Sequence, residues 1–254
     1  MSTLAGRHAL VTGGGTGVGA AIATTLAQAG AAVTICGRRL DPLREIAAGA
    51  TNIRAVVADV TSEKSVAALY EQAETAGEPF DIVVANAGMA ESAPASKTSL
   101  ELWNRTVEVN LTGAFLTVRP ALAAMRARDW GRIVFVASTA GLKGYPYVAP
   151  YVAAKHGVVG LMRALALETA TAGITVNAVC PGFAETDMLS AAVERIVKTT
   201  ERSEAEARAT LAANNPQGRF VRPQEVAAAV LWLCSGESAA ITGQAISVSG
   251  GETW

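Results

Sequence analysis

The stretch Thr12-Gly13-Gly14-Gly15-Thr16-Gly17-Val18-Gly19 follows a short apolar run and precedes an alanine-rich segment with helical periodicity. A strand–turn–helix order places the glycines in the turn, where a backbone without Cβ atoms can approach a ligand closely. The free N–H groups at the start of the following helix favour an anion, such as the pyrophosphate of a dinucleotide. Short glycine motifs also occur in turns that only pack a helix on a strand, so the motif alone leaves both interpretations open.

Outward from this turn, short β-branched runs alternate with helical stretches rich in alanine and leucine along the whole chain. Strands are expected at residues 7–12, 32–36, 53–58, 81–85, 132–137, 174–179 and 244–248. Helices are expected near residues 17–29, 41–48, 63–76, 100–127, 150–172 and 223–234. This alternation predicts an α/β fold: a single-domain, Rossmann-type, doubly wound parallel sheet of seven strands over residues 1–254, with helices on both faces.

Two segments depart from regular alternation. Pro120 lies inside the helical stretch 100–127, where a residue without an N–H group is expected to kink or divide the helix. Residues 188–219 have a helical composition with mixed charge and no strand to pair with them. We therefore expect this segment to be an insertion that lies over the ligand-binding edge of the sheet and covers a substrate.

Composition bounds the class of protein. Of the 254 residues, 50% are hydrophobic, and 21 basic against 22 acidic residues give a net charge of −1, which argues against a nucleic-acid surface. Residues 1–10 lack the pattern of a signal peptide, and the apolar stretch 226–234 is too short to span a bilayer. Cys36, Cys180 and Cys234 lie among aliphatic residues and are expected to be buried, reduced thiols. The prediction is a cytoplasmic enzyme with a small-molecule substrate and no membrane partner.

Further landmarks stand directly after the other predicted strands or within the helices: Asp59-Val60, Asn86-Ala87-Gly88, Asn110, Ser138, Tyr151 with Lys155, and Pro181-Gly182 with Thr186. The carboxyl ends of parallel strands meet at one sheet edge, so these residues should cluster there. Together with the glycine loop, these seven landmarks in order resemble the classical short-chain dehydrogenase/reductases, and the resemblance runs the whole length of the chain.

The resemblance implies a nicotinamide dinucleotide and a role for each landmark. In that family pattern, Asp59 meets the adenine amine, Val60 packs near the adenine, Asn86 lines the ribose and Thr186 meets the nicotinamide carboxamide. The implied cofactor-binding set is Thr12, Gly13, Gly15, Thr16, Gly17, Val18, Gly19, Arg38, Arg39, Asp59, Val60, Asn86, Ala87, Gly88, Tyr151, Lys155, Pro181, Gly182 and Thr186.

The choice between NADP(H) and NAD(H) depends on the end of the second predicted strand. An acidic residue there binds the ribose 2′-hydroxyl of NAD, but this chain has Cys36-Gly37-Arg38-Arg39. Two guanidinium groups can pair with a 2′-phosphate, which favours NADP(H). Thr16 stands where many NADP-using relatives carry a second basic residue, so NAD(H) stays open.

Tyr151 and Lys155 are four residues apart in a predicted helix and therefore project from one face. A neighbouring ammonium and a bound oxidised nicotinamide are expected to favour the phenolate of Tyr151, which makes it a usable acid and base. Ser138 can stabilise the charge that develops on a substrate oxygen. The resemblance adds ribose binding by Lys155 and a main-chain water site at Asn110 that relays protons. This chemistry needs no metal.

The predicted reaction interconverts a ketone and a secondary alcohol. The segments around Ser138, Tyr151 and Pro181 look most like ketoacyl reductases, including polyketide ketoreductases, which implies a 3-oxoacyl thioester and its 3-hydroxy form. The alternative is a compact secondary alcohol or a cyclic or aryl ketone in an apolar pocket formed by Tyr145, Tyr147, Phe183 and Met188. A nucleotide-binding regulator without turnover is a remote third interpretation.

Two expectations concern assembly and the C-terminus. Apolar residues spread around too much of the predicted helix 150–172 for one buried stripe, so this helix is expected to have a partner surface. The resemblance implies a homotetramer in which this helix and helix 100–127 form an interface across a two-fold axis. Ser249 stands where relatives often carry aspartate before two glycines, and we expect only a local capping contact to change.

Overall fold

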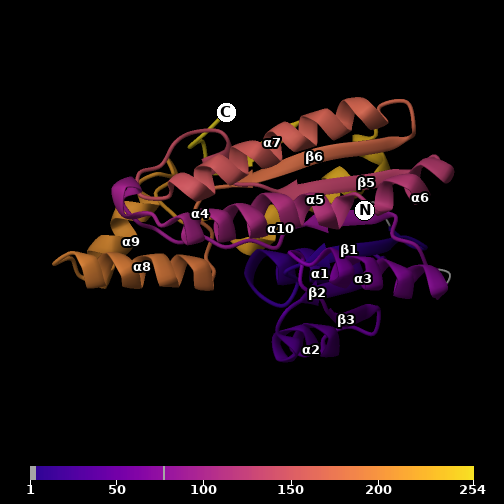
Figure 1. The fold of residues 1–254 in the computed structure, drawn as a ribbon, viewed down its shortest axis with the longest axis horizontal. Coiled ribbons are helices and arrows are strands. Elements are labelled where there is room, and N and C mark those ends of the chain that lie inside the picture. Colours follow the sequence, from indigo (N-terminus) through magenta and orange to yellow (C-terminus); the bar gives the residue numbers. More distant parts are fainter. Residues whose placement is uncertain (1–3, 77) are drawn as a thin grey trace.

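The computed structural model describes residues 4–76 and 78–254. Its centre is one parallel sheet with the strand order β3-β2-β1-β4-β5-β6-β7 (Figure 1). The strands are β1 (His8–Thr12), β2 (Ala32–Gly37), β3 (Ile53–Val57), β4 (Ile82–Ala85), β5 (Gly131–Val136), β6 (Ile174–Pro181) and β7 (Ala245–Val248). The order reverses at β1 and β4, which is the doubly wound arrangement predicted from the sequence.

Helices cover both faces of the sheet. The helices α1 (Gly17–Gln28), α2 (Leu40–Ala48) and α10 (Pro223–Cys234) pack on one face, and their apolar residues share a core with β1 and β2. The helices α3 (Glu63–Thr75) and α7 (Ala149–Thr169) contribute to the core on the other face. Because both faces are covered, β1, β4, β5 and β6 are buried along their whole length, which explains their continuous apolar runs.

The helix expected over residues 100–127 is divided into four segments. They are α4 (Leu100–Val107), a π-helical turn (Glu108–Thr112), α5 (Gly113–Val118) and α6 (Ala121–Ala127). The division before α6 falls at Pro120, as predicted from its missing N–H group. The expectation of one helix was wrong at the π-helical turn, where Asn110 bonds the main chain of Met89 and of Thr106 and so holds a wider turn.

The segment expected to be an insertion forms α8 (Asp187–Thr199) and α9 (Glu204–Ala212). These helices share a small apolar cluster built on Leu189, Val193 and Ala207. In Figure 1 they stand beyond one end of the strands, and α8 begins a few residues after β6 ends. They therefore lie at the carboxyl edge of the sheet, where ligands bind in open α/β folds.

The three cysteines, Cys36, Cys180 and Cys234, are buried free thiols, as expected. Burial raises the pKa of the Cys180 thiol to about 11, so it stays protonated at neutral pH.

Within residues 4–76 and 78–254, no helix has the length and hydropathy needed to cross a bilayer.

Candidate active site

The glycine turn between β1 and α1 adopts a backbone that only glycine takes easily. Gly13 has φ 65° and Gly17 has φ 54°, both in the left-handed region. A Cβ atom on Gly13 would lie 3.0 Å from Nδ2 of Asn86, and one on Gly17 would lie 2.9 Å from Cγ2 of Thr186. The turn therefore packs directly against the segments that follow β4 and β6.

Thr12 and Asn86 tie the ends of β1 and β4 together. The Thr12 hydroxyl oxygen accepts hydrogen bonds from the main-chain N–H groups of Asn86 and Ala87, both at 3.0 Å. The Asn86 side-chain amide donates to the main-chain oxygen of Thr12 at 2.8 Å. Both side chains thus build the carboxyl edge of the sheet, a structural task beside the ribose contact expected for Asn86.

Asp59 and Val60 follow β3 at the same edge. One carboxylate oxygen of Asp59 accepts hydrogen bonds from the main-chain N–H and the hydroxyl of Thr61, at 3.0 and 2.8 Å. The backbone hydrogen bond from Thr61 is the largest of the effects that lower the pKa of Asp59, and the positive charge of Arg38 adds to them. Val60 is buried, with its side chain close to Gly113.

Arg38 and Arg39 follow β2 and are exposed. Among the described residues, neither guanidinium group makes an ion pair or a side-chain hydrogen bond. Both guanidinium groups at the end of β2 therefore stay available to a ligand, because no carboxylate contacts them directly.

Tyr151 and Lys155 lie one turn apart in α7. Lys155 is buried, and its ammonium donates to the main-chain oxygen of Val136, the last residue of β5, at 2.9 Å. The same ammonium lies 5.6 Å from the centre of the Tyr151 ring. Burial lowers the pKa of Lys155 to about 8, so most of the side chain is charged at neutral pH.

The tyrosine pKa departs from the expectation that the ammonium favours phenolate. Burial raises the pKa of Tyr151 above its ordinary value, and the neighbouring Ser138 hydroxyl lowers it by a smaller amount. The surrounding protein residues thus keep the phenol protonated at neutral pH, which suits a proton donor.

Ser138 stands after the end of β5, two residues beyond Val136. Its hydroxyl oxygen accepts a hydrogen bond from the main-chain N–H of Ala140 at 3.1 Å, and its hydroxyl donates weakly to the main-chain oxygen of Pro181 at 3.5 Å. Ser138 therefore bridges the ends of β5 and β6. The structure brings Ser138 and Tyr151 close enough for the serine to influence the tyrosine pKa.

Asn110 lies in the π-helical turn and is buried. Its side-chain oxygen accepts a hydrogen bond from the main-chain N–H of Met89 at 3.3 Å, and a Cβ atom on Gly88 would lie 2.8 Å from that oxygen. The same Gly88 position lies 3.7 Å from the Lys155 ammonium. The structure therefore brings Asn110, Gly88 and Lys155 together, as the landmarks implied.

The four residues expected in a substrate pocket fall into two pairs. The rings of Tyr145 and Phe183 meet edge to face, with centres 6.1 Å apart. Tyr147 and Met188 are exposed, at 64% and 43% of their surface. The structure thus joins Tyr145 to Phe183 and leaves Tyr147 and Met188 on the surface.

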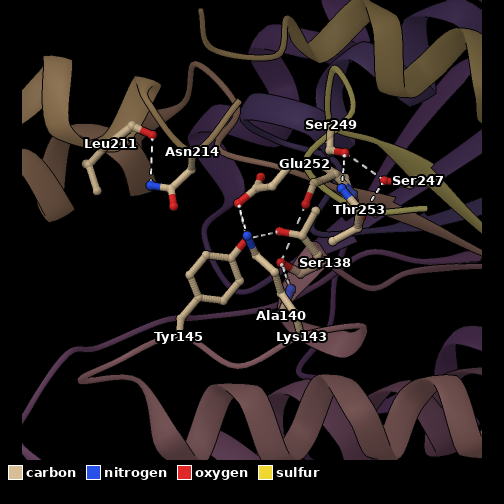
Figure 2. Close-up of polar contacts among 12 residues, drawn as sticks. Ser138, Ala140, Lys143, Tyr145, Leu211, Asn214, Ser247, Ser249, Glu252 and Thr253 are labelled. Atoms are coloured by element: carbon tan, nitrogen blue, oxygen red, sulfur yellow. Dashed lines mark hydrogen bonds and ion pairs between the residues drawn. The ribbon is translucent and has the colours of Figure 1, made fainter. Parts of the chain in front are cut away.

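Sequence reasoning missed Glu252, whose buried carboxylate contacts the loop between Ser138 and Tyr151 (Figure 2). The polar partners of its carboxylate are more than 100 positions away in the chain, so no local pattern indicates it. The Ser249 hydroxyl makes a hydrogen bond with the Ser247 hydroxyl and accepts one from the main-chain N–H of Thr253.

The residues present fit a nicotinamide dinucleotide. The glycine turn forms a cradle that a Cβ atom would fill, α1 starts there, and the free cations of Arg38 and Arg39 stand beside it. Across the described ranges, no group of three or more His, Cys, Asp or Glu side chains is arranged to hold a metal ion.

Comparisons with known proteins agree with this geometry. Residues 7–196 match the sequence profile of the family described as short chain dehydrogenase. The chain is 39% identical to a cis-4-hydroxycyclohexanecarboxylate dehydrogenase of Sinomonas cyclohexanicum, covering 97% of this chain and 96% of the other. It is 38% identical to an acetoacetyl-CoA reductase of Shinella zoogloeoides, covering 97% and 98%. Its fold matches a crystal structure of a single-substitution variant of the actinorhodin polyketide ketoreductase with NADPH, with a TM-score of 0.93, 41% identity and 99% of each chain covered.

Proposed function

We propose that Ser138, Tyr151 and Lys155 carry the chemistry of this chain. The chain belongs to the short-chain dehydrogenase family and is an oxidoreductase that acts on ketone and secondary alcohol groups with a nicotinamide cofactor. The observation that carries this proposal is the position of these three side chains. They meet at the carboxyl edge of the sheet, beside a glycine cradle suited to a dinucleotide.

Each side chain has a defined task in ketone reduction. When bound, the cofactor supplies the hydride that adds to the carbonyl carbon. Tyr151 donates its phenolic proton to the carbonyl oxygen, so that one hydride and one proton complete the alcohol. The Ser138 hydroxyl hydrogen-bonds the same oxygen and stabilises its developing negative charge. The Lys155 ammonium, close to the Tyr151 ring, stabilises the phenolate that remains.

Lys155 also has a second task, holding the ribose hydroxyls on the nicotinamide side. Asn110 supports it as part of a proton relay, since both approach Gly88. The pKa of Lys155 near 8 suits a group that stays charged at neutral pH and can still exchange protons.

The cofactor is NADP(H) in preference to NAD(H). The support is the pair of exposed cations Arg38 and Arg39 at the end of β2, without a carboxylate at that strand end that would repel a 2′-phosphate. The remaining contacts come from Thr12, Gly13, Gly15, Thr16, Gly17, Val18, Gly19, Asp59, Val60, Asn86, Ala87, Gly88, Pro181, Gly182 and Thr186.

The substrate is a 3-oxoacyl thioester, reduced to its 3-hydroxy form, with α8 and α9 covering the bound molecule. Similarity to an acetoacetyl-CoA reductase and to a polyketide ketoreductase supports this choice. The second candidate is a cyclic or aryl ketone. It is favoured by the aromatic pair of Tyr145 and Phe183 and by similarity to a dehydrogenase named for a hydroxylated cyclohexane ring.

The active form is a homotetramer that works in the cytoplasm. Its interfaces use α4, α5 and α7, where large apolar side chains stay exposed in the single chain. Leu100, Trp103, Phe115 and Leu167 expose 73%, 40%, 39% and 83% of their surface.

A steady-state screen tests the function. The purified protein is mixed with 3-oxoacyl thioesters, cyclic and aryl ketones or secondary alcohols, each with NADPH and NADH, and cofactor absorbance is followed. The proposal expects the highest kcat/KM with a 3-oxoacyl thioester and NADPH. Highest activity with a cyclic ketone would favour the second candidate, and no turnover with any substrate would favour a nucleotide-binding regulator.

A further inference from the structure

Glu252 places a buried carboxylate beside Tyr145, one of the residues expected to line the substrate pocket. The residue follows β7 near the C-terminus, and only 1% of its side-chain surface is exposed. One carboxylate oxygen accepts a hydrogen bond from the Tyr145 hydroxyl and forms an ion pair with the Lys143 ammonium at 3.0 Å (Figure 2). A buried carboxylate needs such partners, because an unpaired charge in the interior is costly.

The proton arrangement around Tyr145 follows from the donors available. An ionised carboxylate only accepts hydrogen bonds, so the single phenolic proton goes to Glu252. The Thr139 hydroxyl, 2.6 Å away, then donates to the Tyr145 oxygen. Burial, together with the hydrogen bond to Glu252, raises the pKa of Tyr145, so the phenol stays neutral. Its hydroxyl is thus committed to protein partners, and only the ring of Tyr145 is left for contact with a substrate.

The two polar partners of Glu252, Tyr145 and Lys143, and the Thr139 partner of Tyr145 come from the segment that joins Ser138 to Tyr151. Thr139, Lys143 and Tyr145 all lie between Ser138 and Tyr151 in the chain. The Lys143 ammonium also lies 4.9 Å from the centre of the Tyr145 ring. Glu252 therefore links the C-terminal segment to this loop, which lies between the two residues proposed to bind the substrate oxygen.

Glu252 also packs against the segment that follows β6. A Cβ atom on Gly182 would lie 2.9 Å from the second carboxylate oxygen, which is buried and has no hydrogen-bond partner among the described residues. The next residue, Phe183, meets the Tyr145 ring and packs against the cluster of α8 and α9. The Glu252 carboxylate thus contacts Tyr145, whose ring meets Phe183, and Phe183 in turn packs against α8 and α9.

We infer that Glu252 is a positioning residue that selects the substrate: it fixes the Tyr145 ring as an apolar wall of the pocket. Ketones with an apolar ring or alkyl substituent on that side are favoured, because no polar group of Tyr145 remains free. This inference rests on the proposed function, since it assigns a wall to the pocket of the same site. It adds a specificity role for the C-terminal segment.

A double-mutant cycle tests the inference. Glu252→Ala, Tyr145→Phe and the double variant are compared with an aryl ketone and with a compact aliphatic ketone. Each single change should raise KM for the aryl ketone at least about fivefold and leave kcat within about twofold, because the wall loosens while the catalytic groups stay. The double variant should match the worse single variant, since both changes break one link. Additive effects, or an equal rise in KM for the compact ketone, would overturn the inference.

Two further variants separate positioning from general destabilisation. Glu252→Gln keeps an oxygen that accepts from Tyr145, so KM should return close to the wild-type value. Glu237→Ala removes an exposed carboxylate elsewhere and should leave both KM values unchanged. Thermal unfolding of every variant shows which are folded. If Glu252→Ala does not fold, Glu252→Gln with Tyr145→Phe completes the comparison, and a Glu252→Gln variant with a KM as high as Tyr145→Phe would count against the inference.

Hydrogen–deuterium exchange gives a readout that does not depend on activity. Exchange in residues 139–147 and in residues 249–254 should speed up together in Glu252→Ala and in Tyr145→Phe. Faster exchange in only the mutated segment would overturn the link between the two segments. If the wild type reduces no ketone, the proposed function fails, and the exchange result alone then supports or overturns the link.

Discussion

The ammonium of Lys155 donates a hydrogen bond of 2.9 Å to the main-chain oxygen of Val136, which joins α7 to the last residue of β5. This bond sets the distance between two separate elements of the site. Tyr151 stands one turn before Lys155 on the helix, and Ser138 stands two residues after Val136 on the strand side. One buried side chain thus holds the proposed proton donor beside the proposed oxyanion partner.

Replacing Tyr151 by phenylalanine should remove the proton donor and keep the ring. We expect turnover to fall by about two to four orders of magnitude, the usual contribution of a general acid. Cofactor affinity, measured by fluorescence titration, should change by less than about twofold, because the packing stays. A phenylalanine variant with most of its turnover would contradict the assignment of Tyr151.

Lys155 gives the folded protein a pH-dependent stability with a definite sign. Its pKa is about 8 in the folded chain and 10.5 in the reference state, so between these values the unfolded chain holds a proton that the folded chain has lost. Raising the pH through this window therefore favours the folded state at this residue.

Relative to Lys155→Met, the wild type should gain up to about 3 kcal/mol of unfolding free energy from pH 8 to 10.5. Other buried groups, such as Tyr70, titrate in both proteins and cancel in the difference. Urea unfolding of both proteins across the window measures it. If the unfolding free energy of the wild type minus that of Lys155→Met falls as the pH rises, the pKa of Lys155 is not lowered in the folded protein.

Arg38→Asp should shift cofactor preference toward NAD(H), because the change removes an attraction for the 2′-phosphate and adds a repulsion. We expect the ratio of kcat/KM values for NADPH and NADH to fall at least about tenfold, as for the loss of a charged hydrogen bond. Arg54→Asp serves as the control. Arg54 is exposed and lies near the start of β3, whereas Arg38 follows the end of β2, so this change should leave the ratio unchanged. A wild type that already prefers NADH would refute the role of Arg38.

Gly17→Ala should weaken cofactor binding through crowding as well as backbone strain. Gly6→Ala is a matched control, because Gly6 has φ 76° and no atom within 4 Å of an added Cβ atom. Both changes should cost about 1 to 2 kcal/mol of stability from the left-handed backbone. Only Gly17→Ala, whose Cβ atom would meet Thr186, should also raise the cofactor Kd about tenfold or more in a binding titration. Equal Kd values in both variants would show that the close approach is unimportant.

The assembly prediction uses the exposed face of α7. Light scattering at micromolar concentration should give four times the 26.0 kDa mass of the chain. Leu167→Glu should lower this mass, because a charge on a buried interface is costly, whereas Val57→Glu, on an exposed apolar residue of β3, should not. A stable, active monomer in the wild type would refute the tetramer. A dimer would also contradict it, because only one of the expected interfaces would then form.

Local sequence patterns determined the glycine turn, the seven strands, the division at Pro120, and the shared helix face of Tyr151 and Lys155. These features depend on residues within one element, where strand and helix periods and the missing N–H of proline act directly. Parallel pairing then carried the landmarks to one sheet edge, so the residues of the candidate site could be named in advance.

The tertiary structure alone decided the features that depend on distant partners. The link from Glu252 to Tyr145 spans 107 residues, and the π-helical turn at Asn110 is held by a bond to Met89 from another loop. The direction of the Tyr151 pKa shift also belongs here, because burial outweighs the effects expected from its sequence neighbours. Desolvation and hydrogen bonding act between groups that only the packed chain brings together, and no spacing in the sequence encodes their distance.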